Sequence, residues 1–183
     1  RLYKKYNILA GDGTVCKCSF RNEYGKNIAS YTISIILNTM NNMIYDYRLC
    51  FDNNELSGIL NTKLTLSDII VLDRGYSKLS LIDKLSKRTN FVIRLTRNLM
   101  IYKKFIKSGK DCMIINRKGY RIKLIRYYVD KETRIIIKDK YGDNNSEDND
   151  PFFVIATNLI DLTFDEMCEL YKKRWEVEVC NKN

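Results

Sequence analysis

The chain has 183 residues, 45% of them apolar, with a formal net charge of +10 and no histidine. A chain of this length can fold as one domain with a sizeable core, and its charge favours a polyanionic partner. No stretch approaches the ~18 uninterrupted apolar residues of a membrane-spanning helix. We therefore expect no membrane segment and an intracellular location, in the cytoplasm of a prokaryote or the nucleus of a eukaryote.

The six cysteines lie scattered beside apolar residues, without any C-x-x-C pair. This spacing, with histidine absent, argues against a zinc site and against the disulfide framework of a small secreted domain. We interpret the cysteines as free thiols of a reducing compartment.

The first fifty residues are rich in strand-forming runs. Tyr6–Ala10 and Val15–Phe20 flank a Gly-Asp-Gly-Thr sequence, which predicts two strands joined by a tight turn with Asp12 at or next to it. Tyr31–Asn38 and Met43–Phe51 flank a pair of asparagines, which favour the positive-φ positions of a hairpin turn. An antiparallel meander of three to four strands follows.

The next segment reads as a crossover unit. After a short helix over Glu55–Leu60, the apolar run Ser67–Asp73 predicts a strand buried on both faces. Ser77 is a good N-cap for a helix over Lys78–Arg88, and Phe91–Thr96 returns as a strand. Open α/β sheets bind ligands at the carboxyl ends of their strands, so the aspartate that ends the first of these strands is a candidate site residue.

The excess positive charge lies in one segment. From Arg94 to Tyr141 there are 15 Lys or Arg against 4 Asp or Glu. Three strands are expected here, over Cys112–Asn116, Gly119–Val129 and Thr133–Lys140. The acidic sequence Gly142–Asp150 contains no apolar residue and predicts a loop.

Within the middle strand, Arg121, Lys123 and Arg126 alternate with apolar residues. They predict a sheet face that is largely cationic and suited to DNA phosphates. The competing interpretation is an ordinary soluble surface.

A last buried strand, Phe152–Thr157, precedes a helix over Thr163–Asn183 that starts in a capping-box sequence. Tyr171, Arg174 and Glu178 stand at i, i+3 and i+7, on one face of that helix.

The chemistry that unites these residues is metal-assisted phosphodiester transfer. Two divalent cations ~3.5 to 4 Å apart can hold the nucleophile and stabilise the leaving oxygen, and carboxylates are their natural ligands. Asp12, Asp73 and Glu178 have this placement if the first strand and the strand before Asp73 are neighbours. Separately, Asp12 also fits a turn aspartate, and Glu178 fits a surface ion pair with Arg174.

Four blocks occur in order between residues 6 and 182: Asp-Gly-Thr, then Asp-Arg-Gly-Tyr with Phe-Val-Ile-Arg-Leu-Thr-Arg-Asn, then Ala-Thr-Asn-Leu, then Tyr-x-x-Arg-Trp-x-Val-Glu. This wording resembles the DDE transposases of bacterial insertion sequences, in the subgroup numbered four that carries a Tyr-Arg-Glu-Lys signature.

The resemblance implies an α/β, ribonuclease-H-like fold, a mixed sheet flanked by helices with a β-rich insertion before the last strand and helix. Residues 1–97 would form the first part of the catalytic core, 98–150 the basic insertion with its acidic loop, and 151–183 the last strand and the glutamate-bearing helix.

The resemblance also implies two Mg²⁺ ions, replaceable by Mn²⁺, held by Asp12, Asp73 and Glu178. Tyr171 and Arg174 would contact DNA phosphates near the cut. The signature lysine would fall beyond the last residue, and Lys182 matches the Phe-Lys step that commonly precedes it. We expect Lys182 to contact DNA as well.

The function implied is that of a transposase catalytic core, a fragment or a decayed copy, that cleaves DNA and transfers the strand in cut-and-paste transposition. Its partners would be transposon-end and target DNA, with a homodimer in the DNA complex as a further possibility. The alternatives are a ribonuclease-H-like nuclease or resolvase, and an inactive DNA-binding transposase remnant.

Overall fold

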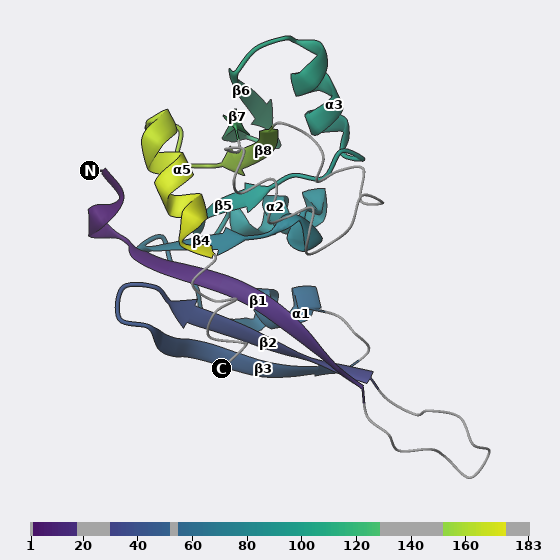
Figure 1. Ribbon diagram of the computed structural model, residues 1–183, viewed down its shortest axis with the longest axis vertical. Coiled ribbons are helices and arrows are strands. Elements are labelled where there is room, and N and C mark those ends of the chain that lie inside the picture. The colour runs from purple at the N-terminus through teal and green to yellow at the C-terminus, as the bar shows by residue number, and fades with distance from the viewer. Residues whose placement is uncertain (1, 18–29, 52–54, 129–151, 175–183) are drawn as a thin grey trace, which may run out of the picture.

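The computed structural model describes residues 2–17, 30–51, 55–128 and 152–174, which build one mixed β-sheet with helices on both faces (Figure 1). In chain order the elements are η1 (Leu2–Lys5), β1 (Asn7–Lys17), β2 (Ser30–Asn38), β3 (Met43–Phe51), α1 (Glu55–Asn61), β4 (Asp68–Leu72), η2 (Arg74–Tyr76), α2 (Leu79–Leu85), β5 (Asn90–Arg94), α3 (Met100–Lys107), β6 (Cys112–Arg117), β7 (Tyr120–Tyr128), β8 (Phe152–Thr157) and α5 (Phe164–Lys172).

The strand order in the sheet is β3-β2-β1-β4-β5-β8-β7-β6. The first three strands form the predicted antiparallel meander, and Asn42 in the β2–β3 turn has the positive φ, 55°, that asparagine tolerates. β4 and β5 run parallel to β1, with α2 between them in the chain. β8 and β7 continue the sheet in antiparallel pairs, so the sheet is mixed.

The prediction of a tight turn at Gly-Asp-Gly-Thr is wrong. β1 passes straight through Asp12, because β2 pairs with it without a break from Leu9 opposite Asn38 to Lys17 opposite Ser30. Gly11 has a packing reason instead: a Cβ on it would lie 2.7 Å from Cδ2 of Leu72 and 2.9 Å from Cδ1 of Ile59. The glycine lets two core side chains lie directly against the strand.

The predicted N-cap of α2 is also wrong. The cap position is held by Lys78, which makes no side-chain capping bond. The hydroxyl of Ser77 instead accepts a hydrogen bond from the backbone N of Thr96 at 3.0 Å. Ser77 therefore joins the chain after β4 to the chain after β5, and the helix is shorter than its apolar spacing predicts.

The two faces of the sheet carry separate cores. On one face, α1, α2 and α3 pack over a cluster that includes Ile59, Ile82 and Phe105. On the other face, Met167, Leu170 and Tyr171 of α5 pack with Tyr3 of η1 over the second cluster. Side chains alternate along each strand, so residues two positions apart on a strand lie on the same face of the sheet. We call the face covered by α5 the α5 face.

The basic segment joins the same sheet, since β7 is hydrogen-bonded to β8 and β6 to β7. Among its expected strands, Thr133–Lys140 lies outside the described residues, as does the acidic sequence Gly142–Asp150. α3 is an additional element that the strand-forming pattern does not predict.

An α/β fold with a mixed sheet flanked by helices is confirmed. Its first five strands have the order 3-2-1-4-5, with strands 4 and 5 parallel to strand 1, which makes it ribonuclease-H-like. Within the described parts of the chain, no helix has the length and apolar character to cross a membrane.

Candidate active site

Asp12 and Asp73 lie level with each other on neighbouring parallel strands. In the β1–β4 pair, Ala10 is opposite Val71, and each aspartate follows its strand's residue by two positions. Asp73 keeps an extended backbone, with φ −80° and ψ −175°, so the alternation of the strand continues through it. Both aspartates therefore belong to the α5 face, on strands about 4.8 Å apart.

The chain turns sharply after Asp73. Oδ1 of Asp73 accepts a hydrogen bond from the backbone N of Gly75 at 2.8 Å, which caps the short helix η2. The cap fixes one oxygen of the carboxylate and leaves Oδ2 for another partner.

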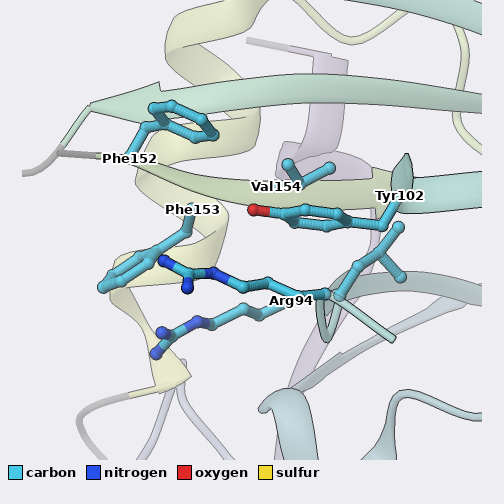
Figure 2. Close-up of a pocket in the computed structure, with 7 residues that line it drawn as sticks. Arg94, Tyr102, Phe152, Phe153 and Val154 are labelled. Atoms are coloured by element: carbon cyan, nitrogen blue, oxygen red, sulfur yellow. The ribbon is translucent and has the colours of Figure 1, made fainter. Parts of the chain in front are cut away.

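Arg94 extends the row by one strand. Val71 is opposite Val92 in the β4–β5 pair, and Arg94 comes two residues after Val92, at the level of Asp73 and on the same face. Its guanidinium carbon lies 3.5 Å from the centroid of the Phe153 ring on β8 (Figure 2). A cation over a ring face is attracted by the ring quadrupole, so Phe153 holds the arginine in place.

α5 brings its own residues to this row. The helix starts in the predicted capping box: Oγ1 of Thr163 accepts from the N of Glu166 at 3.2 Å, and Oε2 of Glu166 accepts from the N of Thr163 at 3.0 Å. The helix packs on β4 and β5 (Figure 1). Tyr171 is 2% exposed and Arg174 8% exposed.

The charges around Tyr171 show which groups meet here. Burial raises the pKa of the Tyr171 phenol most, and the negative charge of Asp73 raises it further. Arg174, which also hydrogen-bonds the phenol, and Arg94 act in the opposite direction. The Tyr171 phenol is close enough to Arg174, Arg94 and Asp73 for each charge to affect its pKa. α5, which contacts β4 and β5, therefore places Tyr171 beside the ends of these two strands.

Tyr171 is held from the sheet side as well. Its ring meets the ring of Tyr127 edge to face at 6.2 Å between centroids, and the Arg174 guanidinium carbon lies 5.8 Å from the Tyr171 centroid. α5 ends at Lys172, short of the predicted Asn183 within the described residues, so Arg174 follows the helix rather than sharing a helix face with Tyr171. The two side chains still contact each other, inside the protein rather than on its surface.

Glu178 and Lys182 lie outside the described residues. Among the residues that are described, no group of three or more Asp, Glu, Cys or His side chains comes together that could hold a metal ion. Asp12 and Asp73 supply two carboxylates on one face at one level, a donor set that suits a hard divalent cation and needs further oxygen ligands. The residues present thus fit the predicted metal as two of its three protein ligands.

The three cations predicted to form one face of β7 do not share it. Arg121 and Lys123 belong to the α5 face by parity, whereas Arg126 belongs to the other. Nζ of Lys123 donates to the carbonyl oxygens of Ile160 and Leu162 in the loop before α5, at 3.2 Å to the first. Lys123 therefore stabilises that loop.

Arg126 packs beneath α3. Its guanidinium carbon lies 5.2 Å from the ring centroid of Phe152 and 5.8 Å from that of Phe105, and Nη2 donates to the carbonyl of Ile106. Of the three cations, Arg121 is the exposed one. The structure gives the other two intramolecular partners.

Sequence reasoning missed Arg94 and Phe153 as site residues. The alternation along the strand was the available signal. Phe91 and Ile93 point to one face and are buried, so Val92 and Arg94 point to the other, and Arg94 brings a charge to that face at the end of the strand. An arginine at a strand end is common enough that the signal carries weight only beside Asp73.

The fold and this row of acidic and basic side chains define a ribonuclease-H-like α/β protein. The sequence matches the family described as "Transposase DDE domain" over residues 3–182, so the chain belongs to that family. A comparison with curated proteins finds no match.

Among solved structures, the chain is similar to endonuclease V of Ciona intestinalis in complex with a 24mer DNA containing an inosine followed by a ribo-adenosine. The similarity has a TM-score of 0.33 and 10% sequence identity, and it covers 96% of this chain and 87% of that one.

Proposed function

We propose that this chain is a transposase catalytic core of the Tyr-Arg-Glu-Lys subgroup that cleaves a DNA strand at a transposon end and joins it to a target. The observation that carries the proposal is the level pair Asp12 and Asp73 on adjacent parallel strands, on the face covered by α5 with Tyr171 near its end and Arg174 just after it. Membership of the transposase family supports it.

Asp12, Asp73 and Glu178 would hold two Mg²⁺ ions, or Mn²⁺ in their place. Bound there, the ions would activate water and stabilise the charge on the attacking and leaving oxygens. The side chains of the chain have their own tasks. Two carboxylates at one level on one face attract a shared cation, and their partial burial strengthens that attraction relative to open solvent.

Arg94 and Arg174 would orient the DNA strand. A guanidinium can bond two oxygens of one phosphate. Both arginines and Asp73 affect the pKa of Tyr171, so the arginines lie near this end of the carboxylate row. Phe153 stacks on the Arg94 guanidinium and would hold it in place for this contact. Arg121, on the same face of the sheet, would contact the duplex farther from the cut, with Lys182 as another DNA contact. Lys123 and Arg126 act on DNA only through the loop and helix that they stabilise.

The partners follow from this chemistry: transposon-end DNA, target DNA and a second copy of the protein in the DNA complex. The setting would be intracellular, in a prokaryotic cytoplasm or a eukaryotic nucleus.

The test is Asp73→Asn, measured as nicking of supercoiled plasmid DNA in Mg²⁺ or Mn²⁺. The amide removes a ligand charge, so nicking should fall by about three orders of magnitude. DNA affinity without metal should stay unchanged or rise, since a negative charge is lost. Asp161→Asn, an exposed carboxylate outside the row, is the matched control and should nick at the wild-type rate.

Retention of nicking by the Asp73→Asn protein would contradict the catalytic assignment. A strand-transfer assay on the wild-type protein separates the alternatives: joined products support the transposase, whereas nicked DNA without joined products would identify a nuclease instead.

A further inference from the structure

A basic groove lies at the other end of the sheet, between α2 and the β6–β7 turn. It has a volume of about 310 Å³ and is open to solvent. Its lining consists of Ser80, Asp83, Lys84, Lys87, Lys118 and Tyr120. No residue of the row Asp12, Asp73 and Arg94 lines it.

The groove is rigidly built. Asp83 of α2 accepts two hydrogen bonds from Arg117, at 2.7 Å to Oδ1 and 3.0 Å to Oδ2, and its Oδ2 lies 2.8 Å from Nζ of Lys118. Burial would raise the pKa of the Asp83 carboxyl, but the bonds from Arg117 and Lys118 outweigh it and hold the pKa below its usual value. The ionised carboxylate thus fixes the β6–β7 turn against α2.

The same pairing leaves the groove with an excess of positive charge. Asp83 is the one acid of the lining and is already shared by two cations. Within the described part of the chain, Lys84 and Lys87 form no ion pair. They stand at i and i+3, joined by a bond from the N of Lys87 to the O of Lys84, so their ammonium groups extend from one side of the helix end.

The location separates this groove from the active site. Ile125 of β7 is opposite Ile155, which is opposite Arg94 at the level of Asp73, so Tyr120 in the groove lies five residue steps of ~3.3 Å, or ~17 Å, along the sheet from that level. β7 is also three strands from β4, or ~14 Å across the sheet, so the two places are ~22 Å apart. α2 also lies on the face opposite to α5. With a rise of ~3.4 Å per base pair, a duplex needs at least ~6 base pairs beyond the cut to reach the groove.

We infer that this groove binds the phosphodiester backbone of duplex DNA away from the point of cleavage. The inference rests on the proposed function only for the identity of the polyanion. Lys84 and Lys87 contact successive phosphates, Lys118 adds charge at the turn, and the Tyr120 ring forms the apolar wall. Contacts of this kind give affinity without base sequence specificity.

The test compares Lys84→Gln/Lys87→Gln with Lys4→Gln/Lys5→Gln, which removes the same charge from exposed lysines of η1. The probe is a fluorescein-labelled duplex of mixed sequence, followed by anisotropy over a salt series without divalent metal. Two lost phosphate contacts should reduce the slope of log Kd against log salt by ~1.8 and weaken binding by at least about tenfold near 0.1 M salt. The control should change neither quantity by more than a small fraction of this.

A duplex shorter than ~6 base pairs provides the second measurement. It cannot contact the active-site end and the groove at once, so the groove variant should lose less affinity for this duplex than for the long one. Equal loss of affinity in the groove and η1 variants, or no loss in either, would show that the groove does not bind DNA. DNA binding is measured without metal, whereas nicking requires metal. A negative binding result for the groove therefore does not affect the nicking result, and absence of nicking does not affect the binding result.

Discussion

Cys168 and Tyr171 on α5 hold their protons more tightly than the same groups in an unfolded chain. Burial raises the pKa of the Cys168 thiol to about 11, from an ordinary value of 9.0, with a further rise from Asp165 and a small opposing effect of Lys172. Burial also raises the pKa of Tyr171. Both groups are therefore neutral at physiological pH, and Tyr171 can act there as a hydrogen-bond donor.

A raised pKa favours the folded state while the group is protonated. The contribution of Cys168 is fully present below pH 9.0 and is lost as the pH rises through about 11. Urea unfolding should show the free energy of unfolding falling over this interval, and falling less steeply in Cys168→Ala. Parallel curves for the two proteins would show that the thiol does not have this raised pKa.

Residue parity accounts for much of what sequence could and could not predict here. The apolar run before each of Asp12 and Asp73 predicts that they end or follow strands, and pairing of the strands places both on the α5 face. The prediction that Lys123 and Arg126 share a face is wrong, because an odd step of three along a strand puts two residues on opposite faces. The odd spacing of Lys123 and Arg126 can be read from the sequence. The hydrogen-bond partners of Lys123 cannot, since its carbonyl acceptors lie almost forty residues away along the chain.

Among the helices, α1 shows a conflict between local preference and packing. Gly58 lies within it, where alanine would favour the helix by about 1 kcal/mol. A Cβ at Gly58, however, would lie 2.4 Å from Cβ and Oγ of Ser34 and 3.2 Å from Sγ of Cys50. The glycine allows α1 to approach β2 and β3 closely.

Gly58→Ala should therefore destabilise the protein, by roughly 1 to 3 kcal/mol in urea unfolding, despite the better helix former. Asn61→Ala, at an exposed position of the same helix, should change stability by less than about 0.5 kcal/mol. Ser34→Gly should recover part of the loss in the double variant. A stabilised Gly58→Ala protein would mean that the helix can move away from the sheet without penalty.

The capping box of α5 determines where the helix that carries Tyr171 and Arg174 begins. Thr163→Ala removes the acceptor for the N of Glu166 and should lower the free energy of unfolding by about 1 kcal/mol. Thr163→Ser keeps the hydroxyl and should remain near wild type. Equal destabilisation of both variants would trace the effect to the lost methyl group rather than to the cap.

Elements with strong local signals were predictable, and those set by distant contacts were not. The β2–β3 hairpin and the capping box are local patterns, and both are confirmed. The continuous β1 depends on pairing with β2, and Ser77 was drawn away from its capping role by the chain after β5. α3 has a local signal too, since its buried Tyr102 and Phe105 stand three residues apart between lysines, and the expectation of strands in the basic segment overlooked it.

For the whole molecule, the important property is that one continuous sheet separates the proposed active site from the proposed DNA-binding groove. The α5 face carries the carboxylates, the arginines and Tyr171, whereas α2 on the opposite face meets the β6–β7 turn in the basic groove. The sequence predicted the strands and the excess charge between Arg94 and Tyr141. It did not predict that this segment would extend the sheet that carries Asp12 and Asp73, because strand order depends on pairing between distant segments.

The two aspartates of the row differ in how the backbone holds them. β1 continues past Asp12 to Lys17 in an unbroken ladder with β2, whereas the chain leaves the sheet directly after Asp73 into a single 3-10 turn. Exposing the amides around Asp12 to deuterium exchange requires opening a hairpin, and exposing those after Asp73 requires unwinding one turn. Hydrogen-exchange measurements should therefore find slower exchange around Asp12 than directly after Asp73, so the Asp73 side is where we expect the backbone to adjust most easily.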